Sequence, residues 1–268
     1  MSPSKPRPLA AMPDPVRRAI RFVLTDIDDT LTTDGKLTAG AYAALERLHT
    51  AGKVVFPVTG RPAGWCDHIA RMWPVDAVVG ENGAFYMRFD ASRNSLVQRF
   101  AAPDDDRQRL RARLAAIGKR ILDAVPGSAL ASDQNYRETD LAIDYCEDVP
   151  ALPQSDVDRI VALMQSEGMT AKVSSIHVNG WFGEYDKLSM TRALAREVFG
   201  ADLDAAREAF VFVGDSPNDA PMFAYFPNAI GVANVRRFLD RIATPPAYVT
   251  AGEAGRGFAE VADFLLAA

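Results

Sequence analysis

The sequence has little cysteine, little histidine and no excess of positive charge. Its 268 residues include two cysteines and three histidines, and 30 Lys and Arg against 35 Asp and Glu give a net charge of −5. Two cysteines are too few for a disulfide framework, so we expect a reducing, cytoplasmic environment. The mild acidity argues against a nucleic-acid partner, because such proteins meet phosphates with a basic surface.

Long apolar runs are also missing. No run approaches the roughly 18 apolar residues that a membrane helix needs, so we expect no membrane partner. Apolar residues still make up 48% of the chain and charged residues 24%, which is typical of a soluble globular protein. A disordered chain is excluded, because this composition can bury enough apolar surface to offset the entropy of ordering. The proline-rich residues 1–19 alone are predicted to form a flexible leader.

Two parts of the chain, residues 20–88 and 183–268, share one pattern. Short runs that are apolar throughout alternate with segments of helical spacing, and these runs lie at 22–24, 54–58, 76–79 and 210–213. Such runs are typical of parallel strands that helices cover on both faces. The expected fold class is therefore α/β, with a Rossmann-like doubly wound parallel sheet.

The middle segment, residues 89–182, is patterned differently. Its strand-like stretches at 128–131, 139–146 and 170–182 alternate polar and apolar residues, which indicates a sheet with one open face. Two helical segments, near 104–124 and 155–167, accompany them. We therefore expect a small α+β domain inserted into the α/β domain. One face of the strand predicted over 170–182 carries Ser175, His177, Asn179 and Trp181.

Pairs of carboxylates follow two of the predicted strands. Asp26 and Asp28 come directly after the first strand, and Asp215 and Asp219 follow the most continuous later one. The carboxyl ends of parallel strands bind ligands, and neighbouring strands lie only about 4.8 Å apart. If these strands are neighbours, the acids converge and repel each other unless protons or a cation neutralise them. Oxygen ligands without a nearby histidine favour Mg²⁺ over zinc.

Groups that favour an anion complete the predicted site. Thr59, Gly60 and Arg61 end the second strand and offer a hydroxyl and backbone N–H groups, while Lys187 begins a helix and supplies a positive charge. Carboxylates, a divalent cation, a hydroxyl and an ammonium group are what phosphoryl transfer requires. Aspartate also serves as a covalent phosphoryl carrier in some ATPases.

These motifs resemble those of the haloacid dehalogenase superfamily, in the same order along the chain. The matching residues are Asp26-x-Asp28-x-Thr30, Thr59-Gly60-Arg61, Lys187 and Gly214-Asp215-x-x-Asn218-Asp219. An insertion between the second and third motifs is similar to the cap domain of the Cof-like subclass IIB, and Glu81-Asn82-Gly83-Ala84 also resembles that branch. Asp29 departs from the pattern, because many members have glycine there.

The resemblance implies a Mg²⁺-dependent phosphatase that acts on a small phosphorylated metabolite, most plausibly a sugar phosphate. Asp26 would attack phosphorus to form an aspartyl-phosphate, and Asp28 would act as the acid and then the base. The metal would be held by the Asp26 carboxylate, the Asp28 backbone carbonyl and Asp215. Asp219 would support either the metal or Lys187.

The resemblance also assigns the phosphate and substrate contacts. Thr59, Lys187 and Asn218 would hold the transferring group, with Gly60 and Arg61 beside them. In the cap, residues 89–182, alternation directs His177 and Asn179 toward the active-site cleft, and Arg137 offers a place for a second anionic group. We expect a monomer or a homodimer.

Two other functions fit part of the same pattern. A phosphosugar mutase of the phosphomannomutase type shares this cap class, although no sequence feature demands the exclusion of water that a mutase needs. A non-catalytic phospho-receiver also uses acids, threonine and lysine around Mg²⁺. Receivers, however, are about half this length and lack an inserted cap, and Asp28 favours turnover.

Overall fold

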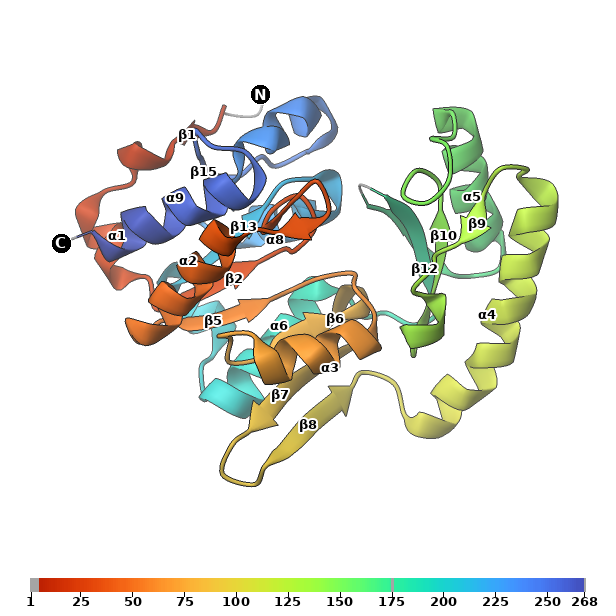
Figure 1. Ribbon diagram of the computed structural model, residues 1–268, viewed down its shortest axis with the longest axis horizontal. Helices are drawn as coiled ribbons and strands as arrows, with labels where there is room; N and C mark the ends of the chain where they lie inside the picture. Colours follow the sequence, from red (N-terminus) through yellow and green to blue (C-terminus); the bar gives the residue numbers. More distant parts are fainter. Residues whose placement is uncertain (1–4, 175, 268) are drawn as a thin grey trace.

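The computed structural model describes residues 5–174 and 176–267. A central parallel sheet and a separate antiparallel sheet, which carries its own helices, form the two halves seen in Figure 1. The central strands, in spatial order, are β1 (Arg7–Pro8), β15 (Tyr248–Val249), β14 (Ile230–Gly231), β13 (Phe210–Gly214), β2 (Phe22–Thr25) and β5 (Val54–Pro57). Every neighbouring pair in this sheet is parallel.

Helices cover both faces of the central sheet. One face packs against α1 (Asp14–Ala19), α2 (Ala39–Thr50), α3 (Ala63–Met72) and α9 (Ala254–Leu266). The other face packs against α6 (Lys187–Phe199), α7 (Leu203–Ala206) and α8 (Ala220–Tyr225). Alternate residues of β13 belong to the two cores, with Val211 on one side and Phe212 on the other, and both are fully buried. Burial on both faces explains the unbroken apolar runs and confirms the predicted α/β class.

The N-terminal segment differs from the predicted flexible leader over residues 7–19. Arg7 and Pro8 pair with Tyr248 and Val249 at the edge of the sheet. Leu9 and Met12 are buried in the core beside α9, and α1 follows them. Proline content favoured mobility, but two apolar side chains spaced three residues apart anchor the segment. Residues 1–4 lie outside the described part of the chain.

A smaller antiparallel sheet extends the central domain. It consists of β6 (Val78–Gly80), β7 (Phe85–Asp90) and β8 (Ser95–Phe100), and the two short strands β3 (Thr32–Thr33) and β4 (Lys36–Leu37) form a separate hairpin. The side chains of Leu96 and Phe100 pack against the same core as α3. The hairpin formed by β7 and β8 spans the predicted boundary between residues 88 and 89. The division of the chain at 88 and 182 stays a prediction.

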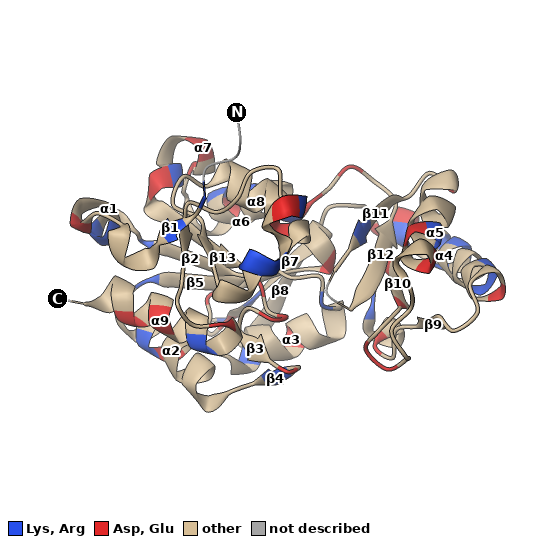
Figure 2. Cartoon of the chain, turned by 90° about the horizontal axis from the view of Figure 1, so that it is seen from above, with Lys and Arg blue, Asp and Glu red and all other residues tan. Residues whose placement is uncertain are grey.

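The inserted segment forms a four-stranded antiparallel sheet beneath two helices. Its strands, in spatial order, are β11 (Thr170–Val173), β12 (His177–Trp181), β10 (Asp140–Asp144) and β9 (Ala129–Leu130). α4 (Asp104–Ala124) and α5 (Gln154–Ser166) cover the face away from the central domain (Figure 1). Both helices carry acidic and basic residues, along the whole of α4 and in the first half of α5 (Figure 2). This sheet and its two helices, which lie within the predicted cap segment 89–182, are called the cap below.

The single strand predicted over 170–182 is wrong. β11 and β12 are two antiparallel strands of one hairpin, in which Val173 pairs with Val178. Apolar residues alternate within each strand, but the phase of the pattern shifts between Val173 and Ile176, and the interpretation of 170–182 as one strand overlooked that shift. Ser175, predicted to share the face of His177, lies outside the described residues. Among the residues described, no helix is both long and apolar enough to cross a membrane.

Gly83 provides a specific test of the packing between the two motif-bearing parts of the central domain. Its φ is +106°, and a Cβ built on it would lie 2.0 Å from the Asp186 carbonyl oxygen, just before α6. We expect Gly83→Ala to lower the free energy of unfolding by at least about 2 kcal/mol, because both strain and a backbone clash oppose it. Gly40→Ala, with no atom within 4 Å of the added Cβ, is the matched control. Equal denaturation midpoints for the two variants would contradict this account.

Candidate active site

The acidic residues predicted to converge do so at the carboxyl ends of β2 and β13. These strands are neighbours, and the Asp26 N–H donates to the Val213 carbonyl at 2.8 Å. One carboxylate oxygen from each of Asp26, Asp215 and Asp219 lies within 4.8 Å of the others, and all three side chains are buried. The structure therefore brings together three of the four predicted metal-binding acids through their carboxylates.

Lys187 is the cation next to these acids. Its Nζ lies 2.8 Å from Asp219 Oδ1 and 3.3 Å from Asp26 Oδ1. Asp186 caps the start of α6 by accepting from the Ser189 N–H, which fixes the first turn and Lys187 with it. Burial by itself would lower the pKa of Lys187, but Asp219 and Asp26 together raise that pKa above its ordinary value.

Lys187 does not fully compensate the negative charge of Asp26 and Asp215. Burial raises the pKa of Asp26 to about 7; Lys187 lowers that pKa, and Asp219 raises it. Burial, followed by the charges of Asp219 and Asp26, raises the pKa of Asp215 well above its ordinary value. A buried set of oxygen donors that resists ionisation is suited to a hard divalent cation.

Two neutral side chains orient Asp215. The Thr30 hydroxyl donates to Asp215 Oδ1 at 3.1 Å, and Asn234 Nδ2 donates to Oδ2 at 3.3 Å. Thr30 belongs to the first sequence motif. Asn234 was missed, because it lies in a 3₁₀ segment after β14 that carries no motif of its own.

The predicted phosphate-binding residues surround the same place. Gly60, Arg61 and Asn218 line a cavity together with Asp26 and Asp28. The cavity holds about 360 Å³ of empty space, its opening to solvent included. Thr59, which precedes Gly60, is fully buried, and its hydroxyl accepts from the Arg61 N–H at 3.1 Å.

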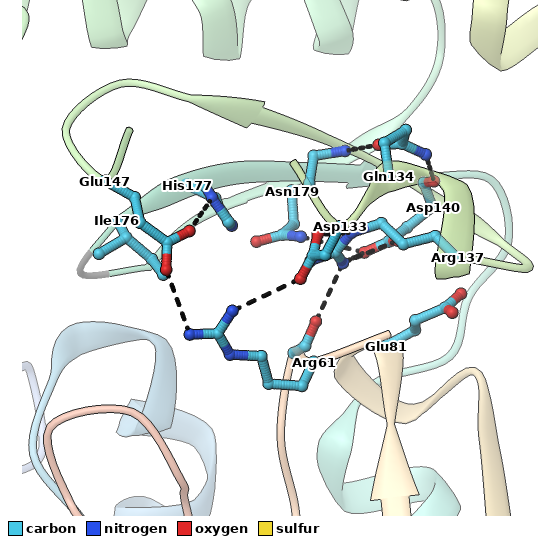
Figure 3. A network of polar contacts seen from close by, with 12 residues as sticks. Arg61, Glu81, Asp133, Gln134, Arg137, Asp140, Glu147, Ile176, His177 and Asn179 are labelled. Carbon is cyan, nitrogen blue, oxygen red and sulfur yellow. Dashed lines mark hydrogen bonds and ion pairs between the residues drawn. The ribbon is translucent and has the colours of Figure 1, made fainter. Parts of the chain in front are cut away.

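Asp28 is held by Arg61 instead of joining the carboxylate cluster. Arg61 Nε and Nη2 lie 3.1 Å and 2.7 Å from Asp28 Oδ1. The guanidinium also reaches two cap carboxylates, Asp133 and Glu147, each at 3.4 Å (Figure 3). Arg61 therefore links the predicted acid–base residue to the cap.

The cap residues predicted to face the cleft line the same cavity, and each has a carboxylate partner. His177 Nε2 lies 2.9 Å from Glu147 Oε2, and Asn179 Nδ2 donates to Asp140 Oδ2 at 3.1 Å. The pKa of Glu147 is lowered, chiefly by its hydrogen bond with His177.

Arg137, predicted to offer a place for a second anion, is buried in ion pairs. It contacts Asp133 at 3.0 Å and Asp140 at 3.1 Å, and it donates to the Gly60 carbonyl at 3.0 Å. Sequence reasoning missed Asp133, Asp140 and Glu147. They occur singly in a loop or strand, and their partners are remote in sequence or were assigned other roles.

Glu81 is a further residue that connects the central domain to the cap. Its carboxylate accepts from the backbone N–H of Ala63 in the central domain and from those of Glu138 and Thr139 in the cap, at 2.7–2.9 Å. The residue is fully buried, with φ at +42°. Burial raises its pKa to about 7; Asp140 adds to the rise, and the Thr139 hydrogen bond opposes it.

The raised pKa of Glu81 predicts a pH-dependent stability. Because the folded pKa of about 7 exceeds the reference value of 4.5, the folded state binds the proton more tightly than the unfolded state. The wild type should therefore lose stability relative to Glu81→Gln as the pH rises from 4.5 to 7, by at most about 3 kcal/mol. Chemical denaturation at several pH values measures this difference. Glu46→Gln, exposed on α2, is the control, and a difference independent of pH would refute the assignment.

Comparison with known proteins supports the resemblance seen in the motifs. The family model of haloacid dehalogenase-like hydrolases matches residues 23–110. No curated protein matches the chain in sequence.

Solved structures share the fold over nearly the whole chain. A crystal structure from Thermoplasma acidophilum has a TM-score of 0.68 at 18% identity and covers 92% of this chain and 98% of its own. A putative HAD/Cof-like hydrolase from Plasmodium vivax has a TM-score of 0.64 at 18% identity, with 93% and 97% covered. The sucrose-phosphatase of Synechocystis, solved with sucrose and phosphate, has a TM-score of 0.62 at 16% identity, with 92% and 98% covered.

The family match spans Asp26, Asp28 and the Thr59–Gly60–Arg61 motif, and the shared fold includes the cap. This confirms the predicted resemblance to the haloacid dehalogenase-like hydrolases, whose family model matches residues 23–110.

Proposed function

We propose that this protein is a Mg²⁺-dependent phosphatase that hydrolyses a small phosphorylated metabolite, a sugar phosphate, through an aspartyl-phosphate intermediate. The observation that carries the proposal is the meeting of Asp26 with Asp215 and Asp219 beside Lys187, at the carboxyl ends of adjacent strands. A chain with only two cysteines fits a reducing cytoplasm, where we propose that it acts.

The donor set fits a magnesium ion. The carboxylates of Asp26 and Asp215 and the backbone carbonyl of Asp28 would hold it, while Asp219 keeps Lys187 in place. The raised pKa values of Asp26 and Asp215 support this choice, because a divalent cation would relieve the repulsion that opposes their ionisation. When bound, the ion would neutralise charge on the phosphoryl oxygens.

Each remaining group has a role in the proposed reaction. An oxygen of Asp26 attacks phosphorus, and Asp28 donates a proton to the departing alcohol. Asp28 then removes a proton from the water that hydrolyses the aspartyl-phosphate. Thr59, Lys187 and Asn218 position the phosphoryl group by hydrogen bonding and charge, beside Gly60 and Arg61.

The substrate class rests on the cavity and on the neighbours. The cavity is lined by Asp26 and Asp28 from the central domain and by His177 and Asn179, two cap residues that can form hydrogen bonds. Among proteins of the same fold is a sucrose-phosphatase solved with sucrose and phosphate. A screen for phosphate release over a panel of phosphorylated metabolites tests this proposal, and interconversion of hexose phosphates without free phosphate would instead indicate a mutase.

Replacement of the nucleophile is the most direct test. We expect Asp26→Asn to lower kcat by at least about 1,000-fold, because an amide is a poor nucleophile toward phosphorus. The fold should persist, since burial already disfavours the charge of Asp26. Asp34→Asn, in an exposed turn, is the matched control. Activity retained by Asp26→Asn, with circular dichroism unchanged, would exclude the proposed nucleophile.

Metal dependence is a second test. Chelation of divalent ions should abolish phosphate release, and added Mg²⁺ should restore it, because the clustered carboxylates otherwise repel the phosphoryl oxygens. The metal should also raise the melting temperature of the wild type, and by less in Asp215→Asn. Full activity after exhaustive chelation would contradict the proposed site.

A further inference from the structure

The cavity above Asp26 contains two guanidinium groups, one from each side of the cleft. Arg61 comes from the loop after β5, and Arg137 comes from the cap. Both side chains are almost completely buried, at 8% and 1% exposure. Two arginines beside a phosphate site would ordinarily suggest that the substrate carries a second anionic group. Their contacts point to the opposite.

Arg61 has nearly all of its hydrogen-bonding capacity occupied. A guanidinium has five N–H donors. Nε and Nη2 donate to Asp28, Nη2 also donates to Glu147, and Nη1 donates to Asp133. The Cζ atom of Arg61 also lies 4.4 Å from the ring centre of Trp65. Little of Arg61 is left to bind an anion on the substrate.

Arg137 is occupied to the same degree. Nε and Nη2 donate to the two oxygens of Asp133, and Nη1 donates to Asp140 and to the carbonyl oxygen of Gly60. These partners hold the guanidinium between the cap and the central domain (Figure 3).

The charges balance as well as the hydrogen bonds. Asp133, Asp140 and Glu147 from the cap, with Asp28, surround the two guanidinium groups. Burial raises the pKa of Asp140, yet even with Asp140 uncharged the carboxylates are no fewer than the cations. A second anion in this cavity would therefore meet no uncompensated positive charge, and it would have to displace carboxylates that already hold the arginines.

We propose that Glu147 and Asp133 are specificity-determining residues: by neutralising Arg61, they restrict the substrate to phosphate esters of neutral polyhydroxylated alcohols and reject those with a second anionic group near the phosphate. Such an alcohol would contact His177, Asn179 and Ser174, which are polar side chains that line the cavity. This inference rests on the proposed phosphatase activity. In this inference, the cap carboxylates select substrates by their charge, through the effect of these carboxylates on Arg61 of the central domain.

A pair of substrates that differ in one group tests the inference. Glycerol 3-phosphate and 3-phosphoglycerate have the same carbon skeleton, but a hydroxymethyl group in the first is a carboxylate in the second. A short substrate is needed, because an adjoining wider cavity is lined by Lys172 and Arg241, which a distant anion would reach. We expect the wild type to favour glycerol 3-phosphate in kcat/KM by at least about tenfold.

Glu147 is the residue to vary, because Asp133 also supports Arg137 and its loss would disturb the fold. Glu147→Gln should reduce the preference for glycerol 3-phosphate by at least about threefold, because the positive charge of Arg61 is then less fully neutralised. Glu147→Asp keeps the charge and should preserve the direction of the preference. Glu167→Gln, which makes the same charge change at the end of α5, should leave the ratio unaltered.

The outcomes separate this inference from the proposed function. If the wild type releases phosphate from no compound in a broad panel, the proposed function fails. If it hydrolyses p-nitrophenyl phosphate but accepts 3-phosphoglycerate as well as glycerol 3-phosphate, or accepts neither, the activity stands and charge selection is wrong. An unchanged ratio in Glu147→Gln would remove Glu147 from the proposal.

Discussion

Mutual repulsion among buried carboxylates is the constraint on which the rest of the site depends. Asp26, Asp215 and Asp219 lie within 4.8 Å of one another, and Lys187 is the only ammonium group that the structure records in ion-pair contact with them. Such a cluster is costly to bury, so the fold must hold it rigidly. The adjacent strands β2 and β13, the capped start of α6 and the close approach at Gly83 provide that rigidity. The arrangement is suited to charge neutralisation on a phosphoryl group.

Charge also joins the two halves of the protein. Arg61 extends from the central domain to cap carboxylates, Arg137 reaches back to a carbonyl of the central domain, and Glu81 accepts from cap N–H groups. The first two of these contacts involve Gly60 and Arg61, in the loop that carries the phosphate-binding motif. Any movement of the cap must therefore exchange partners at Arg61, and with them the surroundings of Asp28.

The sequence was sufficient for the parallel strands β2, β5 and β13 and for the carboxylate cluster. The run at 76–79, predicted as a further parallel strand, instead contributes to β6, which pairs antiparallel with β7 and meets β5 near the isolated parallel bridge between Val58 and Val79. Apolar runs covered on both faces predict parallel strands. Motifs that follow neighbouring parallel strands converge, because the carboxyl ends of those strands lie at the same edge of the sheet. The reversal between β11 and β12 was overlooked, although the apolar pattern changes phase between Val173 and Ile176. The partners of Arg61 and Arg137 were not predictable either, because pairing across two sheets depends on the docking of the cap and not on local pattern.

The N-terminal strand has a consequence for solubility. Without Arg7 and Pro8, β15 would be the border of the parallel sheet and would offer its unpaired backbone groups to another chain. Proline has no N–H to donate, so with Pro8 on the outermost strand the new border is a poor template for intermolecular pairing. Pro8, one of the prolines that predicted a flexible leader, thus disfavours aggregation through this edge of the sheet.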